Sequence, residues 1–227
     1  MRKFVKKSIS MIACFVILGA CSTVAPAAQS IEATITPTSE RGIIILAFGD
    51  SLTEGLGVDP AENYPSQLQA KLQADGYNAQ VINGGISGET TTSALARVDW
   101  MLNTHPDIVI VETGANDALR GVDIQVTSQN IDEIVSRFTD SGAVVIVAGL
   151  QIIQNLGQEY TTPFADIYPT VAEKYGSILI PFVLEGVATD PELNQADYIH
   201  PNAKGYTVMV DHMYPFVLEA IDALQAK

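Results

Sequence analysis

The sequence predicts an α/β fold, a three-layer α/β/α sandwich with a five-stranded parallel sheet. Three observations support this class. The chain has 227 residues, of which 47% are hydrophobic and 17% charged, which suits one domain with a substantial core. Short apolar runs rich in valine and isoleucine recur along it, with helical patterns between them. The runs are continuous and do not alternate with polar residues, as is typical of parallel strands covered on both faces.

Five apolar runs are expected to form the strands. In chain order they are residues 43–48 (IIILAF), 79–83 (AQVIN), 107–112 (DIVIVE), 143–149 (AVVIVAG) and 177–183 (SILIPFV). Their alternation with helices indicates right-handed crossovers. Ligands of such folds bind beyond the carboxyl ends of the strands, so the segments that follow these runs should form the site.

Five segments have helical patterns. They are residues 64–76, which stop at Gly76, and residues 91–104, 124–142, 164–176 and 203–225. Pro215 inside the last segment is expected to kink that helix. The chain shows no internal repeat and no second domain boundary, so residues 42–227 are expected to form a single domain.

The N-terminal segment, residues 1–21, has the features of an export signal. MRKFVKKS is basic, and the twelve-residue apolar stretch that follows is too short to span a bilayer as a helix. Two cleavage patterns compete. Residues 18–21 (LGAC) resemble a bacterial lipobox, which would leave Cys21 as a lipid-modified N-terminus, whereas residues 25–27 (APA) form an A-x-A site that would release a soluble protein. We expect the lipobox, and therefore an exported, periplasmic lipoprotein anchored to a membrane.

Residues 22–41 are rich in Ser, Thr, Ala and Pro, and they are expected to form a flexible linker. The only cysteines of the sequence are Cys14 and Cys21, so the domain has no disulfide. The export signal holds four bases and no acids, which leaves eight bases against 26 acids and a net charge of −18 for the rest. This charge repels phosphate backbones and argues against nucleic acid as a partner.

Ser51 is a candidate nucleophile in FGDSLTEGLG, the stretch that begins within the first strand. A serine nucleophile needs a base and a group that orients the base. Of the three histidines, His105 precedes the third strand at the opposite edge of the sheet, and His212 lies inside the last helical segment. His200 opens that segment with Asp197 three residues before it, a spacing that can bring the carboxylate to one ring nitrogen and leave the other for the serine.

Three groups are candidate donors to the oxyanion of an acyl-transfer reaction: the backbone amides of Ser51 and of Gly88 in ISGET, and the side-chain amide of Asn116 in TGAND. Losing one such donor typically costs about 2.7–4 kcal/mol. Taken singly, Gly88 and Asn116 could equally be turn residues. Glu112 ends a strand near these groups, and we expect it to accept hydrogen bonds from turn amides and not to act as a catalytic acid.

The blocks GDSL, ISGET, GAND and DYIHP occur in this order, and NDALRG includes the asparagine. With these blocks the sequence resembles the SGNH (GDSL-type) hydrolases, a flavodoxin-like fold, and especially their bacterial secreted esterases of the thioesterase, arylesterase and lysophospholipase type. The likeness runs from about the first strand to the C-terminus. It implies that Ser51 is the nucleophile, that Gly88 and Asn116 complete the oxyanion hole with the Ser51 amide, and that Asp197 and His200 complete the triad.

The resemblance implies a serine hydrolase that cleaves carboxylic esters, and also thioesters or lysophospholipids, of short-to-medium acyl chains through an acyl-enzyme. Four apolar residues are candidates to line an acyl channel, with ordinary packing under loops as an equal alternative: Leu119, Ile152, Ile153 and Leu156. G-x-S-x-G, G-x-x-x-x-G-K-[ST] and H-E-x-x-H are absent, and no cofactor or metal is expected. We expect a monomer whose partners are small acyl esters or thioesters and whose contact with a membrane is through the lipid anchor. Two alternatives stay open, a carbohydrate O-deacetylase with the same triad and a non-catalytic tethered binding lipoprotein.

Overall fold

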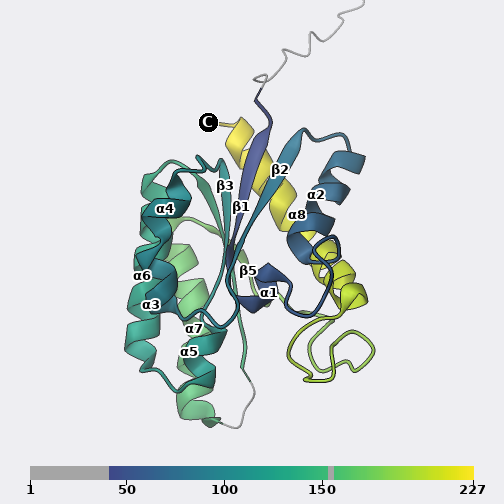
Figure 1. Cartoon of the computed structure of the whole chain (residues 1–227). Helices are drawn as coiled ribbons and strands as arrows, with labels where there is room; N and C mark the ends of the chain where they lie inside the picture. Colours follow the sequence, from purple (N-terminus) through teal and green to yellow (C-terminus); the bar gives the residue numbers. More distant parts are fainter. Residues whose placement is uncertain (1–40, 153–155) are drawn as a thin grey trace, which may run out of the picture. The chain divides into compact units, whose positions relative to one another are not determined.

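The computed structural model describes residues 41–152 and 156–227 (Figure 1). The predicted signal with Cys21, the predicted linker up to residue 40, and Ile153 lie outside the described residues. Within the described ranges, no helix has the length and apolar character needed to cross a membrane.

Five parallel strands form one sheet in the order β2-β1-β3-β4-β5. The strands are β1 (Ile43–Gly49), β2 (Ala79–Gly85), β3 (Ile108–Glu112), β4 (Val144–Ala148) and β5 (Ile178–Ile180). At the carboxyl edge, Gly49 of β1 lies opposite Gly85 on one side and Glu112 on the other. The predicted fold class is confirmed, and this register places the ends of three strands beside one another.

Helices cover both faces of the sheet (Figure 1). On one face lie α2 (Tyr64–Ala74) and α8 (Ala203–Gln225). On the other lie α3 (Thr91–Ala96), α4 (Val98–Leu102), α6 (Ile124–Asp140) and α7 (Gln158–Tyr175). Two short helices, α1 (Ser51–Glu54) and α5 (Ala115–Leu119), follow β1 and β3 at the carboxyl edge of the sheet.

The core is centred on β1 and β3. From Ile45 to Phe48, and along all of β3, each side chain is at most 1% exposed, because helices cover both faces. Phe48 of β1 packs edge-to-face against Phe138 of α6, with ring centroids 5.1 Å apart. The strand β2 lies at the edge of the sheet and exposes Gln80 and Asn83, so burial on both faces does not extend to it.

Several predicted boundaries were wrong. The segment 91–104 is two helices that break at Arg97, whose φ of −109° and ψ of 4° leave the helical region. The guanidinium of Arg97 donates hydrogen bonds to Glu89 and to the carbonyl of Gly49 at the end of β1. The break between the two helices allows the side chain to reach both groups. The helix α7 begins six residues before the predicted start, upstream of Pro163, and there Tyr160 is held by a hydrogen bond to the Val122 carbonyl.

Two further observations concern prolines. The strand β5 ends at Ile180, directly before Pro181, and is shorter than the predicted run 177–183. Pro215 lies within α8, which continues as one helix through it.

Candidate active site

The nucleophile candidate lies at a sharp turn between β1 and α1. Asp50 caps α1, and its Oδ1 accepts a hydrogen bond from the Leu52 amide at 3.1 Å. Gly49 is required at the turn, because a Cβ atom there would clash with the Thr53 hydroxyl and the Glu112 carbonyl. Ser51 is the first residue of α1 and only 8% exposed. The small residues of the GDS block therefore allow β1 to end in a tight turn that holds Ser51 at the rim of the sheet.

The structure brings Ser51, His200 and Asp197 together. Ser51 Oγ lies 2.9 Å from His200 Nε2, although the two residues are 149 positions apart. On the other side of the ring, His200 Nδ1 lies 2.7 Å from Asp197 Oδ2. Because the carboxylate accepts the Nδ1 proton, Nε2 is free to accept the serine proton. This is the geometry that a serine nucleophile and its base need.

The connection between β5 and α8 holds Asp197 and His200 as one unit. Asp197 Oδ1 accepts the amides of Ile199 and His200 at 3.0 and 3.1 Å. The intervening Tyr198 has a φ of 60°, which turns the loop back so that the carboxylate can reach the ring. The loop is tied at its base, since the Gln195 amide donates to the His200 carbonyl at 2.8 Å.

The hydrogen bonds to Asp197 keep its carboxyl ionised. Partial burial pushes its pKa upward, but the bonds from the His200 ring and from the amides of Ile199 and His200 outweigh that effect. The pKa of Asp197 falls to about 2. At neutral pH the group is therefore an acceptor only, which fixes the tautomer of the His200 ring.

The other two histidines have other surroundings. His212 Nε2 lies 3.0 Å from the carbonyl of Phe182, and its ring packs edge-to-face against Phe216. His105 lies in the turn that leads into β3, at the amino end of the strand.

The segments with Gly88 and Asn116 border the turn at Ser51. Asn116 lies in α5, and its Nδ2 donates to Asp50 Oδ2 at 3.2 Å. Gly88 has a φ of 76°, a conformation that favours glycine. Its loop is joined to the end of β1, where the Ile86 amide donates to the Gly49 carbonyl at 3.1 Å. Each of the three predicted donors to an oxyanion thus follows a different strand, and the three strands are neighbours.

Two buried carboxyls lie under the turn. Burial raises the pKa of Asp50 to about 6, although the hydrogen bonds from Leu52 and Asn116 lower it. Burial also raises the pKa of Glu112 well above its ordinary value, and the charge of Asp50 adds to this shift. Glu112 Oε2 accepts the Thr53 hydroxyl at 2.8 Å, whereas its buried Oε1 has no hydrogen-bond partner among the described residues. Glu112 therefore meets the turn through the side chain of Thr53, and not through the turn amides expected from the sequence.

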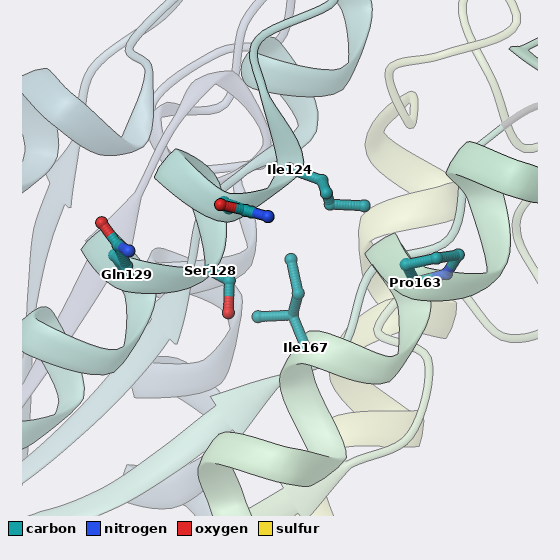
Figure 2. Close-up of a pocket in the computed structure, with 6 residues that line it drawn as sticks. Ile124, Ser128, Gln129, Pro163 and Ile167 are labelled. Atoms are coloured by element: carbon teal, nitrogen blue, oxygen red, sulfur yellow. The ribbon is translucent and has the colours of Figure 1, made fainter.

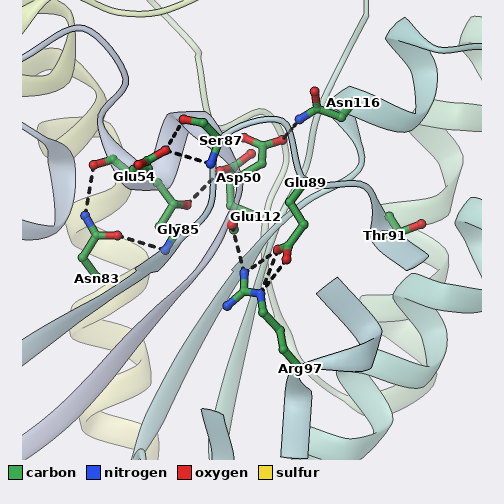
Figure 3. Close-up of polar contacts among 12 residues, drawn as sticks. Asp50, Glu54, Asn83, Gly85, Ser87, Glu89, Thr91, Arg97, Glu112 and Asn116 are labelled. Atoms are coloured by element: carbon green, nitrogen blue, oxygen red, sulfur yellow. Dashed lines mark hydrogen bonds and ion pairs between the residues drawn. The ribbon is translucent and has the colours of Figure 1, made fainter. Parts of the chain in front are cut away.

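A polar network around the turn was not predicted from the sequence (Figure 3). Arg97 Nε donates to Glu89 at 2.7 Å, Arg97 Nη2 donates to the Gly49 carbonyl at 3.2 Å, and the guanidinium stacks on the Phe48 ring. Glu54 of α1 accepts the amide of Ser87 at 2.7 Å. The signal in the sequence is weak, since charged residues near a motif are usually part of a solvated surface.

The predicted acyl-channel residues have mixed surroundings. Leu119 is 58% exposed at the end of α5, and Leu156 is 44% exposed before α7. Ile152 is half-buried and packs against the core, so ordinary packing describes it, and Ile153 lies outside the described residues.

One surface pocket, of about 310 Å³, lies between α6 and α7 (Figure 2). It is lined by Ile124, Gln125, Ser128, Gln129, Pro163 and Ile167. None of these side chains titrates near neutral pH, and none is a predicted site residue. No group of three or more His, Cys, Asp or Glu within residues 41–152 and 156–227 could hold a metal ion.

Comparisons with known proteins show the family of the chain. The model of the GDSL-like lipase/acylhydrolase family matches residues 47–208. An arylesterase of Vibrio mimicus is 40% identical over 168 residues, which are 74% of this chain and 84% of the relative. The thioesterase 1/protease 1/lysophospholipase L1 of Escherichia coli is 34% identical over 170 residues, or 74% of this chain and 80% of the relative. The crystal structure of AlinE4, an SGNH-hydrolase family esterase, is 39% identical and superposes with a TM-score of 0.68 over 81% of this chain and 98% of its own. The chain therefore belongs to the GDSL-like lipase/acylhydrolase family.

Proposed function

We propose that this family member is a carboxylic ester hydrolase that works through an acyl-enzyme on Ser51. The observation that carries the proposal is the continuous hydrogen-bond path from Ser51 Oγ through the His200 ring to Asp197, with distances of 2.9 and 2.7 Å. Asp197 and His200, three positions apart in the loop after β5, are thereby linked to a serine that follows the end of β1. Packing of the fold alone does not require this arrangement.

The reaction takes place in two halves. Ser51 Oγ attacks the carbonyl carbon of the ester while His200 Nε2 accepts the serine proton, and Asp197 stabilises the imidazolium. The amides of Ser51 and Gly88 and the side-chain amide of Asn116 donate to the oxyanion. When the C–O bond breaks, or the C–S bond of a thioester, His200 gives its proton to the leaving alcohol or thiol. A water molecule then attacks the acyl-enzyme with His200 as base, which releases the carboxylic acid and restores Ser51.

Apolar acyl groups are the substrate class that the surface around Ser51 favours. Eight large apolar side chains are exposed in the described residues. Six of them lie in the connections that lead from the carboxyl end of a strand to the next helix that covers the sheet. These six are Leu56, Ile86, Leu119, Leu156, Tyr198 and Ile199. Exposed apolar side chains that gather around a reactive group indicate an apolar ligand. Arylesters, thioesters and lysophospholipids, which the names of the relatives mention, all have such acyl chains.

The test is hydrolysis of p-nitrophenyl acetate, butyrate and octanoate by the wild type and by Ser51→Ala. An esterase hydrolyses several chain lengths, and the variant loses this activity by several orders of magnitude. Hydrolysis of the acetate alone would favour a carbohydrate O-deacetylase. A wild-type rate equal to that of Ser51→Ala would favour a tethered binding protein and reject the proposal.

The role of the exposed apolar side chains can be tested with Leu119→Ser. A buried methylene contributes about 0.8 kcal/mol, so loss of contacts to several methylenes should lower kcat/KM for octanoate at least tenfold and leave acetate nearly unchanged. Trp100→Ser is the matched control, because Trp100 is 69% exposed on α4 and outside the carboxyl-edge segments. Equal effects of Leu119→Ser on both esters would show that Leu119 does not contact the acyl chain.

We also propose that the protein is exported and anchored to a membrane through a lipid on Cys21. Support comes from the basic segment, the apolar stretch and the lipobox-like LGAC of the sequence. Cys21→Ser should move the activity from the membrane fraction to the soluble fraction. A wild type that is already soluble after cell fractionation would instead favour cleavage at residues 25–27. We expect a monomer, which sedimentation of the domain tests.

A further inference from the structure

The loop that offers an oxyanion donor has a glycine, Gly88, at the donor position, and this residue has no side chain to anchor it. The proposed function uses the Gly88 amide as an oxyanion donor, and a glycine with a φ of 76° has nothing of its own to fix where that amide lies. The position of Gly88 therefore depends on contacts made by its neighbours and by its own carbonyl.

On the N-terminal side, Glu54 holds the loop. Its Oε2 accepts the backbone amide of Ser87 at 2.7 Å and also accepts the Ser87 hydroxyl (Figure 3). Glu54 ends α1, the helix that begins with Ser51. The residue before Gly88 is thus tied to the helix that carries the nucleophile.

On the C-terminal side, Arg120 holds the loop. Its Nη2 donates to the carbonyl of Gly88 itself at 2.6 Å. Arg120 follows α5, the helix that carries Asn116. The second anchor of the Gly88 loop therefore comes from the element that supplies another of the proposed oxyanion donors.

The contact of Arg120 is not a by-product of an ion pair. Among residues 41–152 and 156–227, Arg41, Arg97 and Arg137 have carboxylates within 4.0 Å of their guanidinium groups, and Arg120 has none. The chain has 26 acidic residues that an exposed arginine could pair with. Arg120 instead binds the carbonyl of Gly88, which indicates that it stabilises the position of this loop.

We infer that Glu54 and Arg120 are positioning residues that hold the Gly88 amide at the oxyanion hole. The inference rests on the proposed function. Together with the bond from Asn116 to Asp50, their contacts join the three donor-bearing segments pairwise, so that the turn at Ser51, the Gly88 loop and α5 form a closed triangle. Donors to an oxyanion act only when they lie about 2.7–3.1 Å from the place where its charge develops, so a loop that can shift by a fraction of an ångström donates less well.

The experiment compares Arg120→Met and Arg120→Lys, and Glu54→Ala and Glu54→Gln, on p-nitrophenyl butyrate. Removal of a whole donor costs about 10²–10³-fold in kcat, and loosening one should cost about tenfold, with KM changed about twofold or less. Lysine can still donate to the Gly88 carbonyl, and glutamine can still accept the Ser87 amide, so both conservative variants should recover most of the rate. Inactivation by a p-nitrophenyl phosphonate, whose phosphoryl oxygen occupies the oxyanion hole, should slow by the same factor as kcat.

Two controls separate positioning from folding and from general charge effects. The midpoint of thermal unfolding of each variant should stay within about 2 °C of the wild type, because Glu54 and Arg120 are exposed. Arg137→Met removes a partly exposed arginine, on α6, and should leave kcat unchanged.

Three outcomes would overturn the inference. The first is a wild-type kcat and phosphonate rate in both Arg120→Met and Glu54→Ala. The second is a fall in rate that tracks a fall in the unfolding midpoint. The third is a rise in KM for an anionic ester such as 4-carboxyphenyl butyrate with no change for the neutral one, which would make Arg120 a substrate-binding group. In each case Ser51→Ala is measured alongside: an inactive Ser51→Ala leaves the proposed function standing while the positioning role fails, and an active one rejects the proposed function itself.

Discussion

Replacing Asp50 with asparagine should change how the free energy of unfolding depends on pH. Burial beside the nucleophile raises the pKa of Asp50 from 3.8 to about 6 in the folded state. An acid whose pKa is higher in the folded state binds its proton more tightly there, so protonation stabilises the fold. The contribution is nearly absent at pH 7, grows as the pH falls through 6, and is complete below about 3.8.

The size of the effect follows from these two pKa values. Linkage gives a gain in stability of about 1.4 kcal/mol at pH 5 and of about 2 kcal/mol at pH 4, relative to pH 7. Asp50→Asn removes the titration, while the asparagine oxygen can still accept the Leu52 amide. The charge of Asp50 also raises the pKa of Glu112 in the folded state. Asp50→Asn removes this charge and lowers the pKa of Glu112, which also reduces the stability that the variant gains at low pH.

Urea unfolding followed by far-ultraviolet circular dichroism at pH 4, 5, 6 and 7 measures the difference. Between pH 7 and pH 4, the wild type should gain about 2 kcal/mol of unfolding free energy relative to Asp50→Asn. Asp222→Asn, at an exposed position on α8, is the control and should run parallel to the wild type. If the curves for Asp50→Asn and the wild type run parallel over this whole pH range, the carboxyl has an ordinary pKa and the reasoning from burial is wrong.

Three further changes have defined outcomes. Asp197→Asn should lower kcat about 10³–10⁴-fold in the p-nitrophenyl ester assay, because the neutral amide no longer fixes the proton on His200 Nδ1; a loss below tenfold would contradict this. Tyr168→Phe removes a buried hydroxyl that donates to a backbone carbonyl at 3.1 Å and should cost about 1–2 kcal/mol in urea unfolding, whereas a neutral effect would mean that water replaces it. Gly49→Ala places a methyl group against the Thr53 hydroxyl and should cost about 1–3 kcal/mol of stability and most of the activity; a fully active, equally stable variant would show that the turn can relax.

The fold could be predicted from the sequence because buried parallel strands leave a strong pattern. The runs of β1 and β3 are apolar except for Glu112 at the end of β3, since both faces of these central strands are covered, and they were located within one or two residues. The break at Arg97 and the start of α7 upstream of Pro163 were not predicted. Each depends on tertiary contacts, those of the Arg97 guanidinium and of the Tyr160 hydroxyl, which local propensity does not encode.

The candidate site could be predicted in part. Ser51, Asp197 and His200 were identified because the chemistry of acyl transfer restricts the residue types and because only one histidine has an acid three positions before it. The supporting groups could not be identified, since a surface Glu or Arg is usually only solvated. Asp50 lies inside the GDSL block, but its contact with Asn116 forms only once α5 is folded against the turn.

The loop after β5 affects how the substrate range of the protein can evolve. The imidazole and the carboxylate that orients it lie on one short, internally braced piece of chain, with Gln195 bonded back to the His200 carbonyl. The distance between His200 and Asp197 is fixed within this short loop. Packing of the domain therefore has to set only the distance between His200 and Ser51 at the start of α1. Insertions in the connections around the braced piece can enlarge or reshape the substrate entrance without disturbing proton transfer, so new substrates can be acquired while the reaction stays the same.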